Sequence, residues 1–183
     1  GGDNIMSKKV IYNARIITAE KITQPSTVWI QDEQTEKIEH QTKPNIPGDY
    51  QAIDAGGYTL IPGMIDVHIH GANGCDMMDG TEESILEVSR TCALTGCTSF
   101  LATSVSSSID DLLKMIRNVK NVIGREPGAK IVGIHLEGPY LNIKRKGMQN
   151  EKHLRHPNKE EMLKILSEAA GLIKMVTIAP ELP

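Results

Sequence analysis

Hydrophobic and polar positions divide the chain into two stretches with different periods. Up to about residue 60, apolar and β-branched residues come in short runs such as Lys9–Thr18 and Thr27–Gln31, and breakers such as Asn45–Asp49 interrupt them. From residue 61, short apolar runs alternate with longer segments whose apolar residues recur every three or four positions. The pattern predicts a small β unit over residues 1–60, followed by an alternating β/α unit over residues 61–183.

The second stretch contains four predicted strands and three predicted helices. The strands are Met64–Ile69, Thr98–Thr103, Lys130–Leu136 and Leu172–Ala179. The helices are Glu82–Thr95, Ile109–Ile123 and Lys159–Ala170, and they are bounded by the N-cap residues Thr81 and Ser108 and by Gly96, Gly124 and Gly171.

Strands that alternate with helices pair in parallel through right-handed crossovers. The chain therefore has the α/β pattern of either a doubly wound sheet or half of a (β/α)8 barrel. Neither G-x-G-x-x-G nor G-x-x-x-x-G-K-[ST] occurs, which argues against a nucleotide-binding fold.

Composition narrows the class of protein. The 183 residues include 39% hydrophobic residues but only 3% aromatic ones, so the core is expected to be aliphatic. A net charge of −3 argues against nucleic acid or an anionic membrane as the main partner, and no apolar run is long enough for a membrane span. Three cysteines without a C-x-x-C pair favour a reducing, cytoplasmic location. Gly1–Ile5 precede Met6 and are expected to be a tag remnant.

The sharpest chemical feature is His68-Ile69-His70 in the first strand of the β/α unit. Residues i and i+2 of a strand project from the same face, so both imidazoles are expected to point one way. Two neutral imidazoles on one wall suit a divalent transition metal. Asp66 shares this face, where it would either hold a histidine or cap the strand.

A second feature ends the third strand. His135 and Glu137 share a face by the same alternation, and Gly138 with Pro139 breaks the strand directly afterwards. Active sites of parallel α/β folds lie at the carboxyl ends of the strands, so Glu137 would reach the centre that His68 and His70 form.

Other polar residues fit ordinary surface roles better. Lys144–Lys146 would meet a phosphate or form a solvated loop, His153 and His156 are expected at the surface, and Cys75 is expected to be structural. The Thr-Ser pair at Thr103 lacks the G-x-S-x-G context of a serine nucleophile.

Several segments together resemble a known family. Leu60–Gly71 is similar to the first barrel strand of the amidohydrolase superfamily. The combination of Gly96–Thr103, Gly133–Tyr140, Lys146–Asn150 and Val176–Glu181 resembles the N-acetylglucosamine-6-phosphate deacetylases.

The resemblance implies a fold, a reaction and site residues. The chain would be the first half, about four βα units, of a (β/α)8 TIM-like barrel preceded by a small β-sandwich-type unit. The family removes acetate from N-acetylglucosamine 6-phosphate, giving glucosamine 6-phosphate. Carried over, His68, His70 and Glu137 would bind one or two divalent ions (Zn, Fe, Mn or Co), and Met148 and Gln149 would contact the substrate. The resemblance also favours a homodimer.

The resemblance covers only part of the family's length. Two further metal-binding histidines and the catalytic Asp would lie beyond residue 183, so we expect the chain to be truncated and to have little activity alone. The half barrel would then pair with another chain or with the missing half.

Two alternatives remain. One is a binuclear amidohydrolase of cyclic-amidase or dipeptidase type, in which Lys174 would bridge two ions. The other is a truncated fragment without catalytic activity.

Overall fold

The computed structural model describes residues 8–32 and 34–183. These residues fall into two compact units, which divide between Pro62 and Gly63. The predicted boundary between residues 60 and 61 lies two residues before this division. Gly1–Ile5, expected to be a tag remnant, lie outside the described residues.

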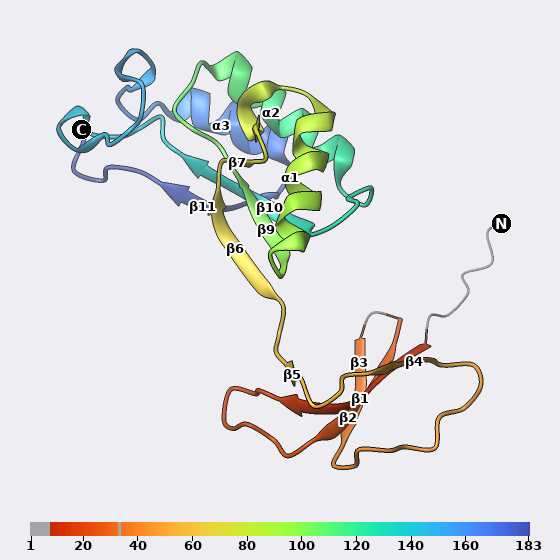
Figure 1. Cartoon of the computed structure of the whole chain (residues 1–183). Coiled ribbons are helices and arrows are strands. Elements are labelled where there is room, and N and C mark those ends of the chain that lie inside the picture. Colours follow the sequence, from red (N-terminus) through yellow and green to blue (C-terminus); the bar gives the residue numbers. More distant parts are fainter. Residues whose placement is uncertain (1–7, 33) are drawn as a thin grey trace. The chain divides into compact units, whose positions relative to one another are not determined.

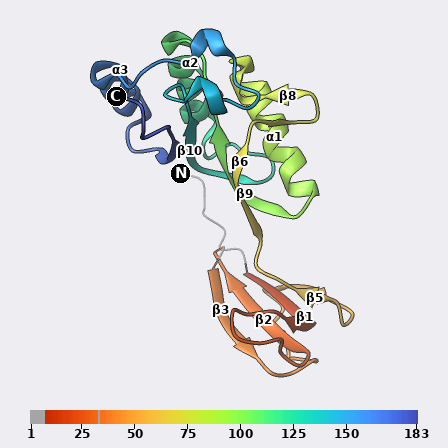
Figure 2. The ribbon, with the colours of Figure 1, turned by 90° about the vertical axis from the view of Figure 1, so that its left-hand side faces the viewer.

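The first unit is one mixed β-sheet. Its strands are β1 (Lys8–Ile16), β2 (Ser26–Gln31), β3 (Gln34–Glu39), β4 (Gln51–Asp54) and β5 (Thr59–Leu60). The order is β3-β2-β1-β4, with β5 also paired to β1, and Figure 2 shows β5 beside β1. The β1–β2 and β2–β3 pairs are antiparallel, whereas β4 and β5 run parallel to β1.

A small β-sandwich-type unit was the expectation and stays a prediction, because the described strands form a single path linked through β1. The register of β1 shifts between Ile11 and Ala14, where Asn13 adopts a positive φ of 56°. This bulge lets the first half of β1 pair with β4 and its second half pair with β5. The bent strand β1 therefore pairs with both β4 and β5 and links them in one sheet.

The second unit is a parallel α/β half-barrel sheet. Its main strands are β6 (Met64–Ile69), β9 (Cys97–Thr103), β10 (Lys130–Glu137) and β11 (Ile173–Thr177), in the spatial order β11-β10-β9-β6. All three pairings are parallel, as predicted. Because all four strands are parallel, their carboxyl ends lie at one edge of the sheet.

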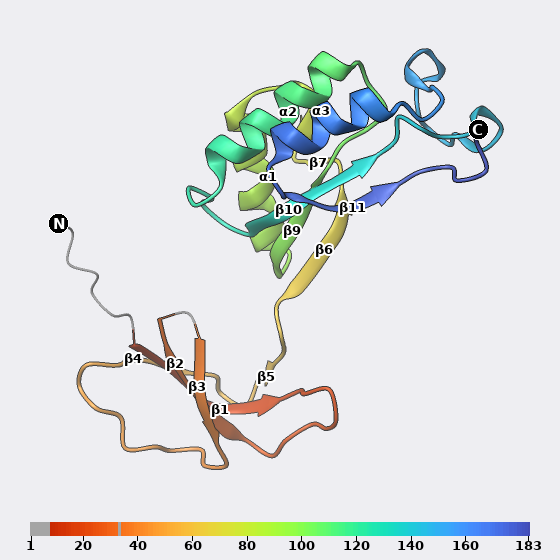
Figure 3. The same cartoon turned by 180° about the vertical axis from the view of Figure 1, so that it is seen from behind.

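Three helices lie on one side of this sheet (Figures 1 and 3). They are α1 (Glu82–Leu94), α2 (Ile109–Val122) and α3 (Lys159–Ala169). The Thr81 and Ser108 side chains accept hydrogen bonds from the first turns of α1 and α2, as their sequence positions predicted. No described helix has the length and apolar character that crossing a membrane requires.

Short elements follow two of the strands. After β6 come β7 (Gly71–Ala72), β8 (Cys75–Asp76) and the 3-10 helix η1 (Met77–Asp79), and after β10 come η2 (Ile143–Arg145) and η3 (Glu151–His153). The sequence pattern predicted none of these.

The core of the second unit lies between the helices and the sheet and is mainly aliphatic, as the composition predicted. Phe100 of β9 is fully buried in one cluster with apolar residues of all three helices, which include Ile85, Ile116 and Ile165. Other apolar side chains of the sheet are exposed, namely Ile65, Val67, Val132 and Val176. The prediction that further chain covers this surface remains a prediction.

Candidate metal centre

Strand β6 presents its two histidines side by side. The Nε2 atoms of His68 and His70 lie 3.1 Å apart, and their rings are nearly perpendicular, with centroids 4.9 Å apart. Strand alternation predicted this shared direction.

Glu137, at the end of β10, completes a triangle of donor atoms. Its Oε2 atom lies 3.2 Å from Nε2 of His68 and 3.0 Å from Nε2 of His70. Strand β9 separates β6 from β10, so only the order of the sheet brings this carboxylate to the histidines. The triangle remains open to solvent, since 48% of the His68 side chain and 17% of the Glu137 side chain are exposed.

A carbonyl sets the tautomer of His70. The Nδ1 atom of His70 lies 3.4 Å from the backbone oxygen of Thr103. Because a carbonyl can only accept, this contact favours the tautomer in which Nδ1 carries the proton and Nε2 has a free lone pair. That lone pair faces Glu137.

Backbone hydrogen bonds hold the chain on both sides of the triangle. The Asp66 carboxylate accepts from the backbone N–H of His68, so it acts on the strand rather than on an imidazole. The Thr103 hydroxyl accepts from the N–H of Ile69, and the Ser104 hydroxyl accepts from the N–H of Glu137. Thr103 and Ser104 are completely buried. At the end of β9, their two hydroxyls therefore bind the backbones of both neighbouring strands, β6 and β10.

The chemistry of the three donors fits a divalent cation. Two donor atoms that each lie about 2.1 Å from one cation, at angles between about 90° and 110°, are about 3.0–3.4 Å apart. The three edges of the triangle measure 3.0, 3.1 and 3.2 Å. Lone pairs of His70 and Glu137 that face each other at 3.0 Å repel unless a proton or a cation lies between them. Imidazole and carboxylate ligands do not select among Zn, Fe, Mn and Co.

His135 lies beneath His68. The two ring centroids are 4.8 Å apart at 87°, and only 1% of His135 is exposed. Its Nε2 atom lies 2.7 Å from the hydroxyl of Thr177 in β11. Burial, followed by the neighbouring charge of His68, lowers the pKa of His135, so its ring is held in the neutral form.

The two residues expected at the substrate differ in their surroundings. Gln149 is 3% exposed, and its Oε1 atom accepts a 2.7 Å hydrogen bond from the backbone N–H of Ser106. Met148 is 76% exposed. A Cβ built on Gly138 would lie 2.2 Å from Oγ of Ser106. Ser106 therefore packs against the residue that follows Glu137 with its side chain and hydrogen-bonds Gln149 with its backbone N–H.

The weaker candidates stay outside the triangle. Lys144, Arg145 and His156 are exposed, and Cys75 is a partly buried free thiol in β8. Lys174 donates to the carbonyl of Gly171, at the opposite end of β11 from Glu137. The alternative in which Lys174 bridges two ions therefore has no support from this geometry.

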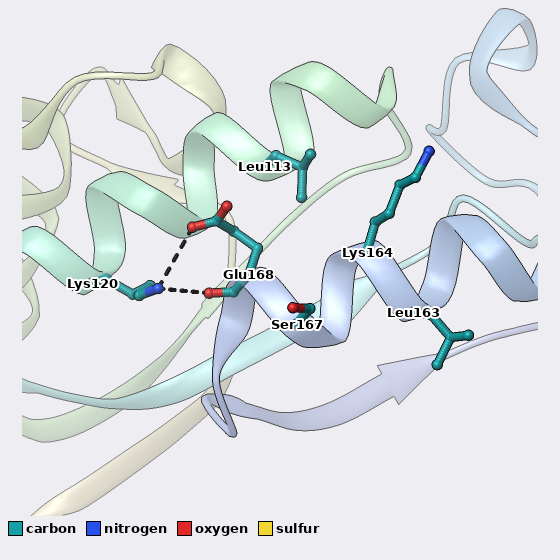
Figure 4. Close-up of a pocket in the computed structure, with 6 residues that line it drawn as sticks. All are labelled: Leu113, Lys120, Leu163, Lys164, Ser167 and Glu168. Atoms are coloured by element: carbon teal, nitrogen blue, oxygen red, sulfur yellow. Dashed lines mark hydrogen bonds and ion pairs between the residues drawn. The ribbon is translucent and has the colours of Figure 1, made fainter.

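A surface hollow of about 550 Å³ lies on the helical layer, away from these donors (Figure 4). It is lined by residues of α2 and α3. There Lys120 donates to the backbone oxygen of Glu168 at 2.8 Å and pairs with its carboxylate at 3.5 Å. These charges fasten one helix to the other and are not free to bind a ligand.

Sequence reasoning missed the supporting residues Ser104, Ser106 and Thr177. Each acts across a distance of 33 to 43 residues along the chain, and only their position at strand ends signals them. The donors themselves were all identified beforehand.

Comparison with known proteins places the chain among amidohydrolases. A model of the amidohydrolase family matches residues 59–183. The N-acetylglucosamine-6-phosphate deacetylase of Bacillus subtilis is 34% identical over 176 residues, which cover 94% of this chain and 44% of that protein.

Solved structures of similar proteins have the same fold. A Pasteurella multocida N-acetylglucosamine-6-phosphate deacetylase has a TM-score of 0.85 at 25% identity, over 96% of this chain and 46% of that one. The Thermotoga maritima deacetylase has a TM-score of 0.74 at 31% identity, over 94% of this chain and 43% of that one. The chain thus spans somewhat less than half the length of these relatives.

Proposed function

The chain belongs to the amidohydrolase family, and from this premise we propose that it forms the metal-binding part of an N-acetylglucosamine-6-phosphate deacetylase. The reaction would remove acetate from N-acetylglucosamine 6-phosphate and leave glucosamine 6-phosphate. The similarity to deacetylases over 94% of this chain supports that substrate.

One observation carries the proposal, namely the triangle of His68, His70 and Glu137, with edges of 3.0–3.2 Å. These residues would hold one divalent ion or share in holding two. Once bound, such an ion polarises an amide carbonyl and lowers the pKa of water toward about 7.

Residues of the chain would also orient the substrate. Because Oε1 of Gln149 is taken by Ser106, the amide nitrogen of Gln149 is the end that can face a sugar hydroxyl. The exposed Met148 side chain would cover an apolar face of the sugar. Buried Ser104 and Thr103 would keep the donors in place while the substrate binds.

The wider context is part of the same proposal. The second unit would be the first half of a (β/α)8 barrel, and its exposed sheet residues would pair with the other half or with a second copy. Free cysteines support a cytoplasmic setting.

Metal binding tests the proposal directly. The metal-free 183-residue chain would be dialysed against Zn²⁺ and its metal content measured, together with a Glu137→Gln variant. Glu83→Gln is the matched control, because Glu83 is exposed in the first turn of α1. We expect the Glu137 variant to bind zinc at least about tenfold more weakly, and the control to match the parent chain.

Equal zinc binding by all three proteins would contradict the proposed centre. Acetate release from N-acetylglucosamine 6-phosphate, measured on the same samples, tests the activity. The expectation that the chain alone shows little turnover stays a prediction for that assay.

A further inference from the structure

His68 is the least constrained of the three donors. Nearly half of its side chain is exposed, compared with 26% for His70. Among the described residues, its Nδ1 atom has no hydrogen-bond partner, whereas Nδ1 of His70 faces the Thr103 carbonyl. Apart from the contacts of its Nε2 atom with His70 and Glu137, no hydrogen bond between described side chains fixes the orientation of the His68 ring.

The buried ring of His135 supplies a further contact. It lies edge to face against His68 at 4.8 Å, on the side of His68 away from solvent, and aromatic rings favour this arrangement. Its Nδ1 atom is buried and has no hydrogen-bond partner among the described residues, and the backbone of Val67, the residue before His68, lies near enough to influence the pKa of the ring. His135 therefore contacts the ring of His68 and lies close to the strand that carries it.

His135 is itself fixed from the other side. Its Nε2 atom lies 2.7 Å from the Thr177 hydroxyl. Thr177 is the register partner of Glu137, and its backbone oxygen accepts from the N–H of Gly138. One threonine of β11 thus contacts both the ring beneath His68 and the strand end that carries Glu137.

A purely structural role would not call for these polar groups. The other buried side chains of β10, Ile131, Ile134 and Leu136, are all aliphatic, and a buried imidazole is costly unless it is hydrogen-bonded. The polar pair occurs at the position that adjoins the donors.

We propose that His135 and Thr177 are positioning residues, which hold the His68 ring so that its Nε2 atom faces His70 and Glu137. This inference rests on the proposed metal centre. Thr177 fixes the plane of the His135 ring, and that ring fixes His68 by contact. Neither residue is a metal ligand.

The test uses Co²⁺ alone as the probe, because its visible absorption spectrum reports ligand geometry. The metal-free chain would be titrated with Co²⁺ in parallel with two variants of Thr177. Thr177→Val keeps the side-chain volume and removes the hydroxyl, whereas Thr177→Ser retains the hydroxyl. His135→Phe keeps a ring that cannot bond Thr177. The matched control is Thr98→Val, because Thr98 lies in the same sheet and its hydroxyl donates a hydrogen bond to the Met64 carbonyl, away from the donors.

We expect Thr177→Val and His135→Phe to bind Co²⁺ about tenfold more weakly, with an altered spectrum. Thr177→Ser and Thr98→Val should keep the affinity and spectrum of the parent chain, and far-UV circular dichroism should show all variants folded. If Thr177→Val and His135→Phe instead match the parent, the positioning role is overturned while the metal centre stands. If the parent chain binds no Co²⁺, both proposals are overturned.

Discussion

Gly138, the residue after Glu137, allows a quantitative test of how closely the residues around Glu137 are packed. Its φ of +72° is a left-handed conformation that costs a residue with a Cβ about 1–2 kcal/mol. An added Cβ would also lie 2.2 Å from Oγ and 3.3 Å from Cβ of the buried Ser106. Overpacking of this kind costs about 1–3 kcal/mol. Gly138→Ala should therefore destabilise the second unit by about 2–5 kcal/mol.

The two costs can be separated in a double-mutant cycle. Ser106→Ala removes the Oγ atom, so that only the looser contacts remain, 3.3 Å to Cβ of residue 106 and 3.4 Å to Cδ1 of Leu141. In that background Gly138→Ala should cost only the backbone share of about 1–2 kcal/mol. The coupling between the two sites should be about 1–3 kcal/mol. Gly124→Ala is the control for backbone strain alone, because Gly124 has a φ of +86° and no atom within 4 Å of its added Cβ.

Urea unfolding followed by circular dichroism at 222 nm measures these free energies. All three α-helices lie in the second unit, so this signal reports mainly on that unit. The single tryptophan, Trp29, lies in the first unit and follows that unit separately by fluorescence. If Gly138→Ala costs the same with and without Ser106 Oγ, the close contact does not limit the site. A cost below about 0.5 kcal/mol in both backgrounds would refute the backbone argument as well.

Two further predictions concern cysteine reactivity and acid stability. Iodoacetamide at pH 8 should label only the partly exposed Cys75 in the folded chain, because Cys97 is buried and burial raises the pKa of Cys92 to about 11. Mass spectrometry should find all three thiols labelled after denaturation. Rapid labelling of Cys92 in the folded chain would contradict the packing. Hydrogen bonds from Ser108, and to a smaller extent from Ser107, lower the pKa of Asp111. The ionised Asp111 carboxylate therefore contributes fully to stability above the ordinary Asp pKa of about 3.9. That contribution is lost as the pH falls through the lower pKa that Asp111 has in the folded chain. Ser108→Ala should therefore cost about 0.5–2 kcal/mol at pH 7 and less at pH 2, and urea unfolding at both pH values checks this.

The sequence predicted the helices and main strands of the second unit closely. The strand Met64–Ile69 has the predicted bounds, and the helix Ile109–Val122 ends one residue earlier than expected. Periodicity and capping residues such as Ser108 are local signals, and these elements form where the signals lie. The first unit was predicted less well, because its short strands pair through the bulge at Asn13 and have weak local signals.

The donor residues were also accessible from the sequence. Strand alternation alone placed His68 and His70 on one face, and the family resemblance named Glu137 as a ligand. The distance of 3.0 Å between His70 and Glu137, however, depends on the order of strands from β6 through β9 to β10. No local pattern encodes that order.

Only the tertiary structure decided what surrounds the donors. The hydroxyl of Ser104 beneath Glu137, the contact of His135 with His68, and the hydrogen bond from Ser106 to Gln149 each join segments far apart in the chain. Such contacts depend on strand register and on where loops return to the sheet, which are set by packing of the whole unit. The chain itself therefore determined which side chains carry the chemistry, and the fold determined how firmly they are held.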